Sequence, residues 1–225
     1  MDVRDAVATR FSCRAFLPIP VPEHIVREIL TLAARSPSAG NVQPWRVHAL
    51  AGERLEALKA LLRPRMAELP NGEGTEFPIF PHDMPDPYRQ RRFAVGEQIY
   101  RSIGVRREDK PARYRQYARN FEFFGAPAGL FVSIERSFVL GQWIDLGSFI
   151  QTVMLLARDY GLHTCPQEAW ASFHRTVAAF LSLPPDMMLF CGVALGYADD
   201  TAPINSWRTP RESLEAFADF SGFTG

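Results

Sequence analysis

Two arginines and a hydroxyl stand at alternate positions near the start of the chain, as Arg10, Ser12 and Arg14. In an extended segment, alternate side chains point the same way, so these three would converge on one patch, with Phe11 and Cys13 turned to the other side. Guanidinium groups match phosphate geometry through charge-assisted hydrogen bonds of about 1.5–3 kcal/mol each. The spacing therefore favours a phosphate-binding patch, although two ordinary surface arginines explain these residues equally well.

A second polar group occupies the turn-rich segment 37–45. Small residues there let the backbone approach a planar ligand closely, and Asn41 and Gln43 offer amide donors and acceptors. An ordinary polar turn is an equally good interpretation of this piece in isolation.

Hydrophobic periodicity indicates the elements that must position these groups. Helices are predicted near the start of the chain and over about 22–34, 53–66, 88–104, 110–124, 144–160 and 173–181, and strands over 45–50, 129–134 and 187–195. Too few strand-helix-strand units occur for a doubly wound sheet, so the predicted fold class is α+β, with a small mixed or antiparallel sheet flanked by helices. We expect one domain over residues 1–225, with a loop and helical excursion at about 70–124 that begins with a long ordered, proline-rich loop of the kind that often forms a lid.

Composition excludes several classes of protein. With 47% hydrophobic and 22% charged residues, the chain is typical of globular proteins rather than disordered or membrane proteins. The start shows no secretory signal, and three cysteines without a C-x-x-C pair suit a reducing compartment, so we expect a cytoplasmic protein with no membrane partner. The net charge of zero argues against nucleic acid as a partner.

Charge is nevertheless uneven along the chain. Residues 89–119 hold ten Lys and Arg against three Asp and Glu. This stretch is either a solvated helical face or a local positive field that attracts anions. Among its arginines, Arg89, Arg91 and Arg92, together with Arg46, are candidates for binding a carboxylate.

Familiar catalytic motifs are missing. The sequence contains no G-x-G-x-x-G, no G-x-x-x-x-G-K-[ST], no G-x-S-x-G and no H-E-x-x-H, and its five histidines lack ligand spacing. We therefore expect no metal site. The remaining candidate functional residues are those suited to binding a phosphate or a planar ring.

In combination, these motifs resemble the FMN-binding nitroreductase family over essentially the whole chain. The segments that carry the resemblance are Arg10-Phe11-Ser12-Cys13-Arg14, Ser36 to Trp45, Pro166-Gln167-Glu168-Ala169, Gly192 to Tyr197 and Arg208 to Leu214. The middle of the chain is similar to the branch that includes nitrobenzoate reductases, through Pro85-Asp86-Pro87-Tyr88, Arg91-Arg92 and Phe123-Phe124-Gly125-Ala126-Pro127.

The resemblance implies an intertwined homodimer with two FMN sites at the subunit interface. The implied cofactor-binding residues are Arg10, Phe11, Ser12, Arg14, Pro37, Ser38, Ala39, Asn41, Gln43, Asn120, Pro166, Gln167, Glu168, Ala169, Arg208 and Arg211. Arg211 matches the C-terminal phosphate-binding arginine. Thr209 replaces a lysine common in relatives, so Arg208 is the candidate substitute. Ala169 stands where relatives commonly have glycine.

The implied activity is transfer of electrons from NADH or NADPH to a small aromatic acceptor, such as a nitrobenzoate, by a ping-pong mechanism. No catalytic side chain is implied, because flavin N5 carries the hydride and a backbone N–H near Glu168 supports it. A nitroarene would accept two electrons to give the nitroso compound and two more to give the hydroxylamine. Reductive dehalogenation, flavin destruction and flavin binding without turnover remain alternatives.

Aromatic residues suggest two further roles. Five aromatic residues could line the acceptor site, although aromatic residues in such segments more often belong to the hydrophobic core. They are Phe77, Phe80, Phe123, Phe124 and Trp170. The tail holds Phe217, Phe220 and Phe223, which a partner subunit would cover.

Overall fold

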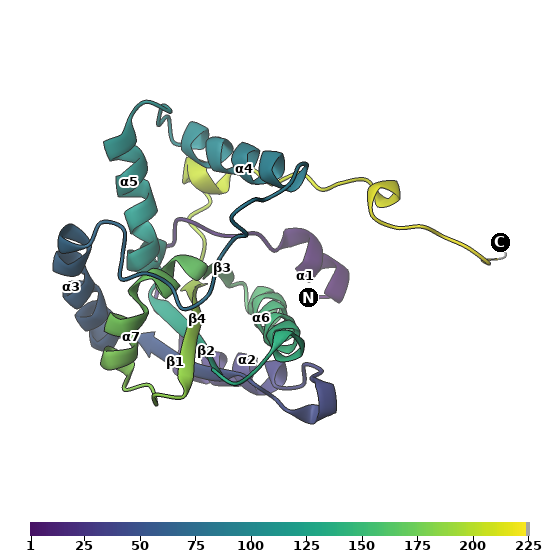
Figure 1. Ribbon diagram of the computed structural model, residues 1–225, viewed down its shortest axis with the longest axis horizontal. Helices are drawn as coiled ribbons and strands as arrows, with labels where there is room; N and C mark the ends of the chain where they lie inside the picture. The colour runs from purple at the N-terminus through teal and green to yellow at the C-terminus, as the bar shows by residue number, and fades with distance from the viewer. Residues whose placement is uncertain (224–225) are drawn as a thin grey trace.

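The computed structural model describes residues 1–223, and in that range helices surround a four-stranded antiparallel sheet (Figure 1). The α-helices are α1 (Val3–Thr9), α2 (Glu23–Ala33), α3 (Gly52–Glu68), α4 (Tyr88–Ser102), α5 (Lys110–Ala118), α6 (Leu140–Asp159) and α7 (His174–Leu181). The strands are β1 (Arg46–Ala51), β2 (Ala128–Glu135), β3 (His163–Gln167) and β4 (Met187–Gly196). Short 3-10 helices are η1 (Ala39–Asn41), η2 (Arg119–Gly125), η3 (Glu168–Phe173), η4 (Pro203–Asn205) and η5 (Leu214–Ala216). The predicted α+β class is confirmed.

The sheet has the strand order β1-β2-β4-β3. The two central strands, β2 and β4, are buried along most of their length because apolar clusters cover both faces of the sheet. One cluster contains the inner residues of α2 and α6, and the other contains those of α3, η2, η3 and α7. Strand β3 was not predicted, because Pro166 interrupts it, but an edge position tolerates proline.

Two glycines in the central strands let large aromatic rings lie against the sheet. A Cβ built on Gly192 would meet the indole of Trp170, and one on Gly129 would meet the ring of Phe123 at 2.6 Å. The rings of Phe123 and Trp170 lie 4.6 Å apart and are fully buried. These rings, together with the buried Phe124, belong to the core, and the alternative that they line an acceptor pocket is wrong for them.

The predicted helix over 110–124 is shorter in the structure. Helix α5 ends at Ala118 and continues as the 3-10 helix η2. Phe123 and Phe124 have φ values of 48° and 55°, in the left-handed region that an α-helix cannot contain. Burial of both rings holds this conformation in place.

The long loop between α3 and α4 is ordered, as predicted, and several contacts tie it to the body. The buried carboxylate of Glu73 accepts hydrogen bonds from the backbone N–H groups of Arg175 and Thr176, at the start of α7. Burial raises the pKa of Glu73, but the hydrogen bonds from Thr176, Arg65 and Arg175 outweigh it and lower that pKa below its ordinary value. Further along the loop, the ring of Phe77 packs against two aromatic rings.

All three cysteines are free and buried. Burial raises the pKa of Cys13 to about 12 and also raises the pKa values of Cys165 and Cys191. Their thiols are therefore protonated at neutral pH and serve as small core side chains.

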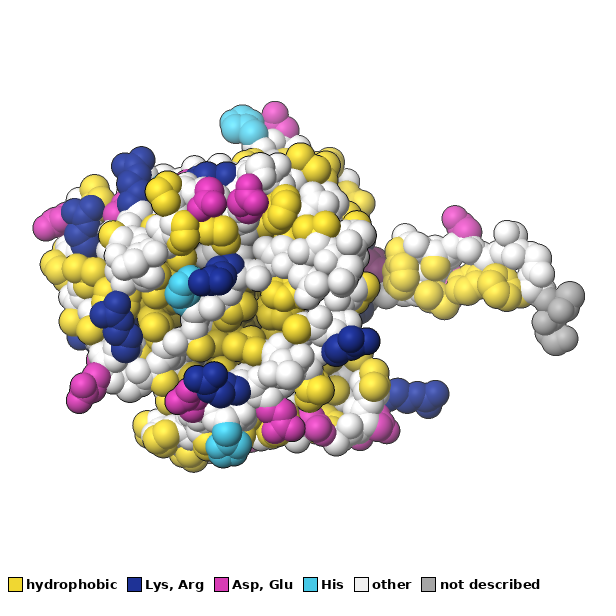
Figure 2. Space-filling model, turned by 90° about the horizontal axis from the view of Figure 1, so that it is seen from below, with side chains coloured by type: hydrophobic (Ala, Val, Ile, Leu, Met, Phe, Trp, Pro, Cys, Tyr) yellow, Lys and Arg dark blue, Asp and Glu magenta, His cyan; other side chains and the backbone are white. Residues whose placement is uncertain are grey.

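The C-terminal segment leaves the body of the protein and projects away from it (Figure 1). Hydrophobic side chains run along this tail and also gather across the middle of the face seen in Figure 2. Phe217, Phe220 and Phe223 are 71%, 65% and 81% exposed. In the part of the chain that the structure describes, no helix is both long and apolar enough to span a bilayer.

Candidate functional site

The segment after α1 is extended, as its alternating pattern predicts, and it lies along the edge of the sheet. Ser12 forms a parallel bridge to Thr164 of β3, and the backbone N–H of Cys13 donates to the Thr164 carbonyl at 2.9 Å. Further on, the N–H of Leu17 donates to the carbonyl of Tyr197, just after β4. The N-terminal segment is thus held between β3 and the start of the C-terminal segment.

Asn205, in η4, joins the two chain ends more directly. Its side chain is almost completely buried, and its Oδ1 accepts a hydrogen bond from the backbone N–H of Arg14 at 2.9 Å. Its Nδ2 donates to the carbonyls of Ala15 and Asp199 at 2.8 and 2.9 Å. Sequence reasoning missed this residue, because a lone asparagine far from its partners leaves no pattern.

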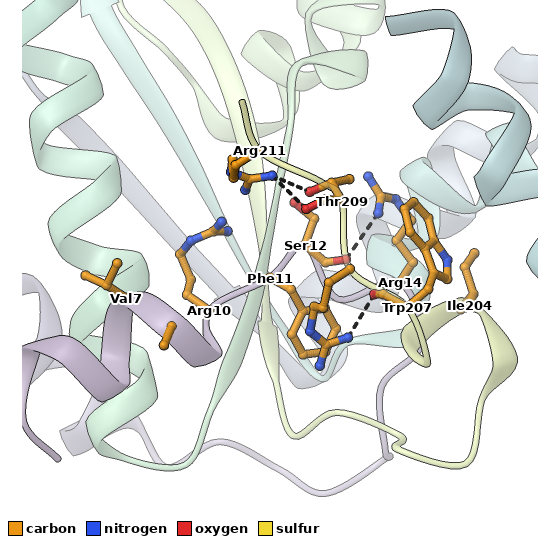
Figure 3. A pocket seen from close by; sticks show the side chains of 11 residues that line it. Val7, Arg10, Phe11, Ser12, Arg14, Ile204, Trp207, Thr209 and Arg211 are labelled. Carbon is orange, nitrogen blue, oxygen red and sulfur yellow. Dashed lines mark hydrogen bonds between the residues drawn. The ribbon is translucent and has the colours of Figure 1, made fainter. Parts of the chain in front are cut away.

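A cavity of about 380 Å³ opens where the two ends meet (Figure 3). Its lining consists of Val7, Ala8, Arg10, Phe11, Ser12, Arg14, Ile204, Trp207, Arg208, Thr209 and Arg211. The structure therefore brings together the arginines predicted from opposite ends of the sequence. None of these four arginines forms an ion pair with a carboxylate of residues 1–223.

Neutral oxygens of nearby residues hold three of these guanidinium groups. Nη1 of Arg211 donates to Oγ1 of Thr209 at 2.6 Å, and Nη1 of Arg208 donates to the carbonyl of Asn205 at 2.7 Å. Burial lowers the pKa of Arg10, and the positive charge of Arg211 lowers it further. Because each guanidinium has five N–H donors, most of them stay available to an anion in the cavity.

Phe11 packs against the core cluster that contains Cys13, and it also borders the cavity. Cys13 points into the core as expected, and Phe11 lines the cavity beside Ser12. Its ring lies 5.0 Å from the ring of His163, and the guanidinium of Arg208 sits 3.7 Å from its centroid.

Trp207 also lines the cavity, and sequence reasoning missed it. Its indole Nε1 is buried and has no hydrogen-bond partner in the structure. A buried donor without a partner is costly, at about 1–3 kcal/mol, which points to a partner that a ligand supplies. The only signal in the sequence is that Trp207 stands next to Arg208.

Strand β3 leads from the cavity to a second group of predicted residues. Thr164, beside the cavity, and Gln167 are three residues apart on β3, which corresponds to about 10 Å. The Nε2 of Gln167 donates to the backbone carbonyl of Asn120 at 2.8 Å, so these two predicted residues are neighbours. The Oε1 of Gln167 is buried without a partner.

The remaining residues of this motif surround the end of β3. Pro166 and Ala169 are half-buried, and Glu168 begins η3 directly after the strand. Burial raises the pKa of Glu168. The backbone of this segment is thus exposed enough to meet a ligand and is fixed by the sheet behind it.

The loop at residues 37–43, predicted to line the same ligand, lies at the opposite end of α6 from the cavity. The backbone N–H of Ala39 donates to Asp145 near the start of α6, whereas Arg158, near the end of α6, donates to Thr9 beside the cavity. Thirteen residues of helix separate Asp145 from Arg158, or about 20 Å. One chain therefore does not bring Pro37, Ser38, Ala39, Asn41 and Gln43 to the arginine cavity.

Metal chemistry finds no support among residues 1–223. No group of three or more His, Cys, Asp or Glu side chains there could hold a metal ion. The polar groups that converge are cations and neutral donors, which suit an anionic ligand.

Comparison with known proteins identifies the family. The sequence profile of the Nitroreductase family matches residues 7–197. The chain belongs to the nitroreductase family. The match starts within α1 and ends at Tyr197, so it covers β1 to β4 and the N-terminal half of the cavity.

Characterised members of the nitroreductase family extend the similarity to almost the whole chain. A 4-nitrobenzoate reductase of Pseudomonas putida is 40% identical over 99% of this chain and 96% of its own length. A nitrobenzene nitroreductase of Ectopseudomonas oleovorans is 34% identical over 97% and 96%. The similarity to the nitrobenzoate reductase branch is confirmed.

Solved nitroreductase structures show the same fold. The FMN and NADPH-dependent nitroreductase NfnB from Sphigopyxis sp. strain HMH has a TM-score of 0.95 at 41% identity and covers 99% of this chain and 100% of its own. The FMN-dependent nitroreductase NfnB from Mycobacterium smegmatis, in complex with NADPH, has a TM-score of 0.92 at 30% identity and covers 97% of each chain.

The joining of the chain ends in this nitroreductase can be tested at Asn205. The change Asn205→Ala is expected to lower the free energy of unfolding by about 2–4 kcal/mol, because it leaves buried backbone groups without partners. Urea unfolding at fixed protein concentration measures this. Asn71→Ala, at an exposed loop position, is the matched control. Equal, small losses for both variants would contradict a joining role for Asn205.

Proposed function

We propose that this protein is an FMN-dependent oxidoreductase that uses NADH or NADPH to reduce nitroaromatic compounds, including nitrobenzoates. The observation that carries the proposal is the cavity of about 380 Å³ lined by four arginines that form no ion pair with a carboxylate of the described residues. A relative named as a 4-nitrobenzoate reductase and a structure named as an FMN and NADPH-dependent nitroreductase, each similar over almost the full length, support this chemistry.

The cavity fits the phosphate end of FMN. Arg10, Arg14 and Arg211 would share the charge of the phosphate, and the hydroxyl of Ser12 would donate to it. A phosphate monoester carries about −1.5 to −2 charges at pH 7, which would relieve the repulsion between Arg10 and Arg211. We assign Arg208 to the same phosphate in place of the lysine of other family members, and Phe11 to the cavity wall.

The end of β3 fits the flavin ring. Asn120 and Gln167 would offer amide groups to the pyrimidine edge, where the unpartnered Oε1 of Gln167 would gain a donor. Pro166 and Ala169 flank the backbone N–H of Glu168, which we assign to flavin N5. Burial raises the pKa of this Glu168 carboxyl above its ordinary value.

FMN itself supplies hydride transfer between the nicotinamide and the acceptor. The residues of the protein bind and orient the cofactor, so no catalytic side chain is needed. We infer that the whole chain forms one FMN-binding domain, with the segment at about 70–124 as its excursion.

A homodimer explains how the loop residues that lie far from the arginine cavity in their own chain could still contact the flavin. Pro37, Ser38, Ala39, Asn41 and Gln43 would reach the flavin from the partner subunit, because in their own chain they lie about 20 Å along α6 from the cavity side. The start of α6 exposes a strip of apolar side chains, with Leu140 at 82% and Ile144 at 71%. A second copy would cover this strip and the phenylalanines of the tail.

Spectroscopy and turnover test the proposed activity. The purified protein is expected to be yellow with bound FMN, to bleach when titrated anaerobically with NADH or NADPH, and to reduce 4-nitrobenzoate with ping-pong kinetics. Haloaromatic compounds serve as control acceptors and are expected to react far more slowly. A bound flavin that neither nicotinamide bleaches would instead identify a flavin-storing protein and overturn the proposal.

The phosphate assignment is tested by Arg211→Ala. Loss of one charge-assisted hydrogen bond is expected to weaken FMN binding by about 10- to 100-fold. Fluorescence titration of the apoprotein with FMN measures the dissociation constant. Arg4→Ala, on the exposed side of α1 and outside the cavity lining, is expected to change it less than twofold. Unchanged affinity in Arg211→Ala would remove this residue from the site.

The dimer is tested by light scattering, which is expected to give twice the chain mass of 25.4 kDa. A variant with serine at positions 217, 220 and 223 is expected to dissociate more readily and to lose FMN, because the tail no longer buries apolar surface. Leu61→Ser, at an exposed position of α3, is the control. A monomeric wild-type protein that retains FMN would refute the shared site.

A further inference from the structure

A second cationic cleft lies between α4 and α5, outside the flavin cavity. It has a volume of about 580 Å³. Its lining consists of Arg89, Arg92, Phe93, Gly96, Glu97, Arg107, Lys110 and Arg113. Five cations therefore face one carboxylate, and half of the ten Lys and Arg residues of the positive stretch 89–119 line this cleft.

Three of these cations are free to bind an anion. Arg89 is paired with Asp86 at 2.8 Å, and Arg113 is paired with Glu97 at 2.7 Å. Arg92, Arg107 and Lys110 have no ion pair with any carboxylate of residues 1–223.

Aromatic rings hold the guanidinium groups in place. Arg92 lies 3.9 Å from the ring centroid of Phe80, in the long loop, and Arg107 lies 5.1 Å from that of Phe93. Arg113 lies 3.7 Å from that of Tyr100, and its Nη1 is buried without a hydrogen-bond partner. Stacking restricts the rotamers of these long side chains, so less conformational entropy is lost when an anion binds.

Gly96 keeps the cleft open. Glycine inside a helix is less favourable than alanine, so it usually has a packing reason. At Gly96, a Cβ would meet nothing within 4 Å. The absence of a side chain instead leaves room in the cleft beside Phe93, whose ring is 52% exposed.

The cleft lies within reach of the flavin site on two sides. On one side, Arg91 of α4 pairs with Glu212, the neighbour of Arg211, so a helix about 10 Å thick separates the cleft from the phosphate cavity. On the other side, Arg113 precedes Asn120 by seven residues, or about 10 Å along α5 and its continuation. A dinucleotide whose nicotinamide meets the flavin ring can extend its other end this far.

We propose that the cleft between α4 and α5 binds the adenosine 2′,5′-bisphosphate end of NADPH, and that it gives the protein a preference for NADPH over NADH. The proposal rests on the proposed function. Arg92, Arg107 and Lys110 pair with the 2′-phosphate, which NADH lacks, and the exposed ring of Phe93 stacks with adenine.

A charge-removing variant tests the preference. The double variant Arg107→Gln/Lys110→Gln is expected to lower kcat/KM for NADPH at least tenfold and to change kcat/KM for NADH less than twofold. The matched control, Arg101→Gln/Arg115→Gln, removes two cations from the same helices outside the cleft lining and is expected to leave both values within twofold. FMN content is measured in every variant. Equal losses for NADPH and NADH would overturn the proposal.

A variant that fills the cleft makes the same test without a change of charge. Gly96→Leu is expected to raise KM for NADPH several-fold while thermal unfolding shows no loss of stability, because leucine favours helix and its side chain enters open space. If KM rises for 4-nitrobenzoate and not for NADPH, the cleft binds the carboxylate of the acceptor, and the proposal is wrong.

Direct binding separates failure of this proposal from failure of the proposed function. Calorimetry on the purified protein compares adenosine 2′,5′-bisphosphate with adenosine 5′-monophosphate and inorganic phosphate, and it needs no turnover. Tighter binding of the bisphosphate, lost in Arg107→Gln/Lys110→Gln, supports the site even if no nitroaromatic is reduced. Equal binding of all three probes, or equal binding by the wild type and the variant, overturns it.

Discussion

Four guanidinium groups around one small cavity repel each other, and within residues 1–223 no carboxylate pairs with them to offset that repulsion. The covalent chain does not do this, because Arg10 and Arg211 are almost as far apart in sequence as two residues of this protein can be. Hydrogen bonds from β3 and from the buried Asn205 fix the two extended segments instead. An anion in the cavity would offset this repulsion, so the arrangement of the arginines favours a negatively charged ligand.

Two regular elements set the distances between the parts of the site. Strand β3 separates the arginine cavity from the Asn120 and Gln167 pair by about 10 Å, which suits one elongated ligand. Helix α6 separates the cavity from the loop at 37–43 by about 20 Å. That distance is too long for the same ligand to contact both within one chain. The same helix exposes apolar residues near that loop. Separation within the chain and unburied surface thus both favour a site shared between two copies.

Local patterns in the sequence predicted most of the fold and about half of the site. Strands β2 and β4 and helix α6 are strongly apolar, so their positions were predicted correctly. Strand β3 was missed because its edge position accepts polar residues and Pro166, and η2 was missed because positive φ values at Phe123 and Phe124 depend on packing. These features arise from contacts between distant segments, which local periodicity does not record.

In the site, too, some residues could be predicted from the sequence and others could be found only in the folded structure. The family resemblance named the arginines at both ends, and the structure brings them together. Asn205 and Trp207 could not be predicted, because each acts through partners that only the folded chain places nearby. Phe11 packs against the core cluster that contains Cys13, as alternation predicts, but its contact with the cavity was not evident from alternation alone. The cleft between α4 and α5 appeared in the sequence only as an excess of charge.

The buried cysteines have a consequence for the durability of the enzyme. Reduction of a nitroarene by two electrons gives a nitroso compound, an electrophile that thiolates attack. Cys13, Cys165 and Cys191 are at most 2% exposed, and burial keeps their sulfur atoms protonated. Within residues 1–223 the protein therefore presents no exposed cysteine thiolate to an electrophile of this kind.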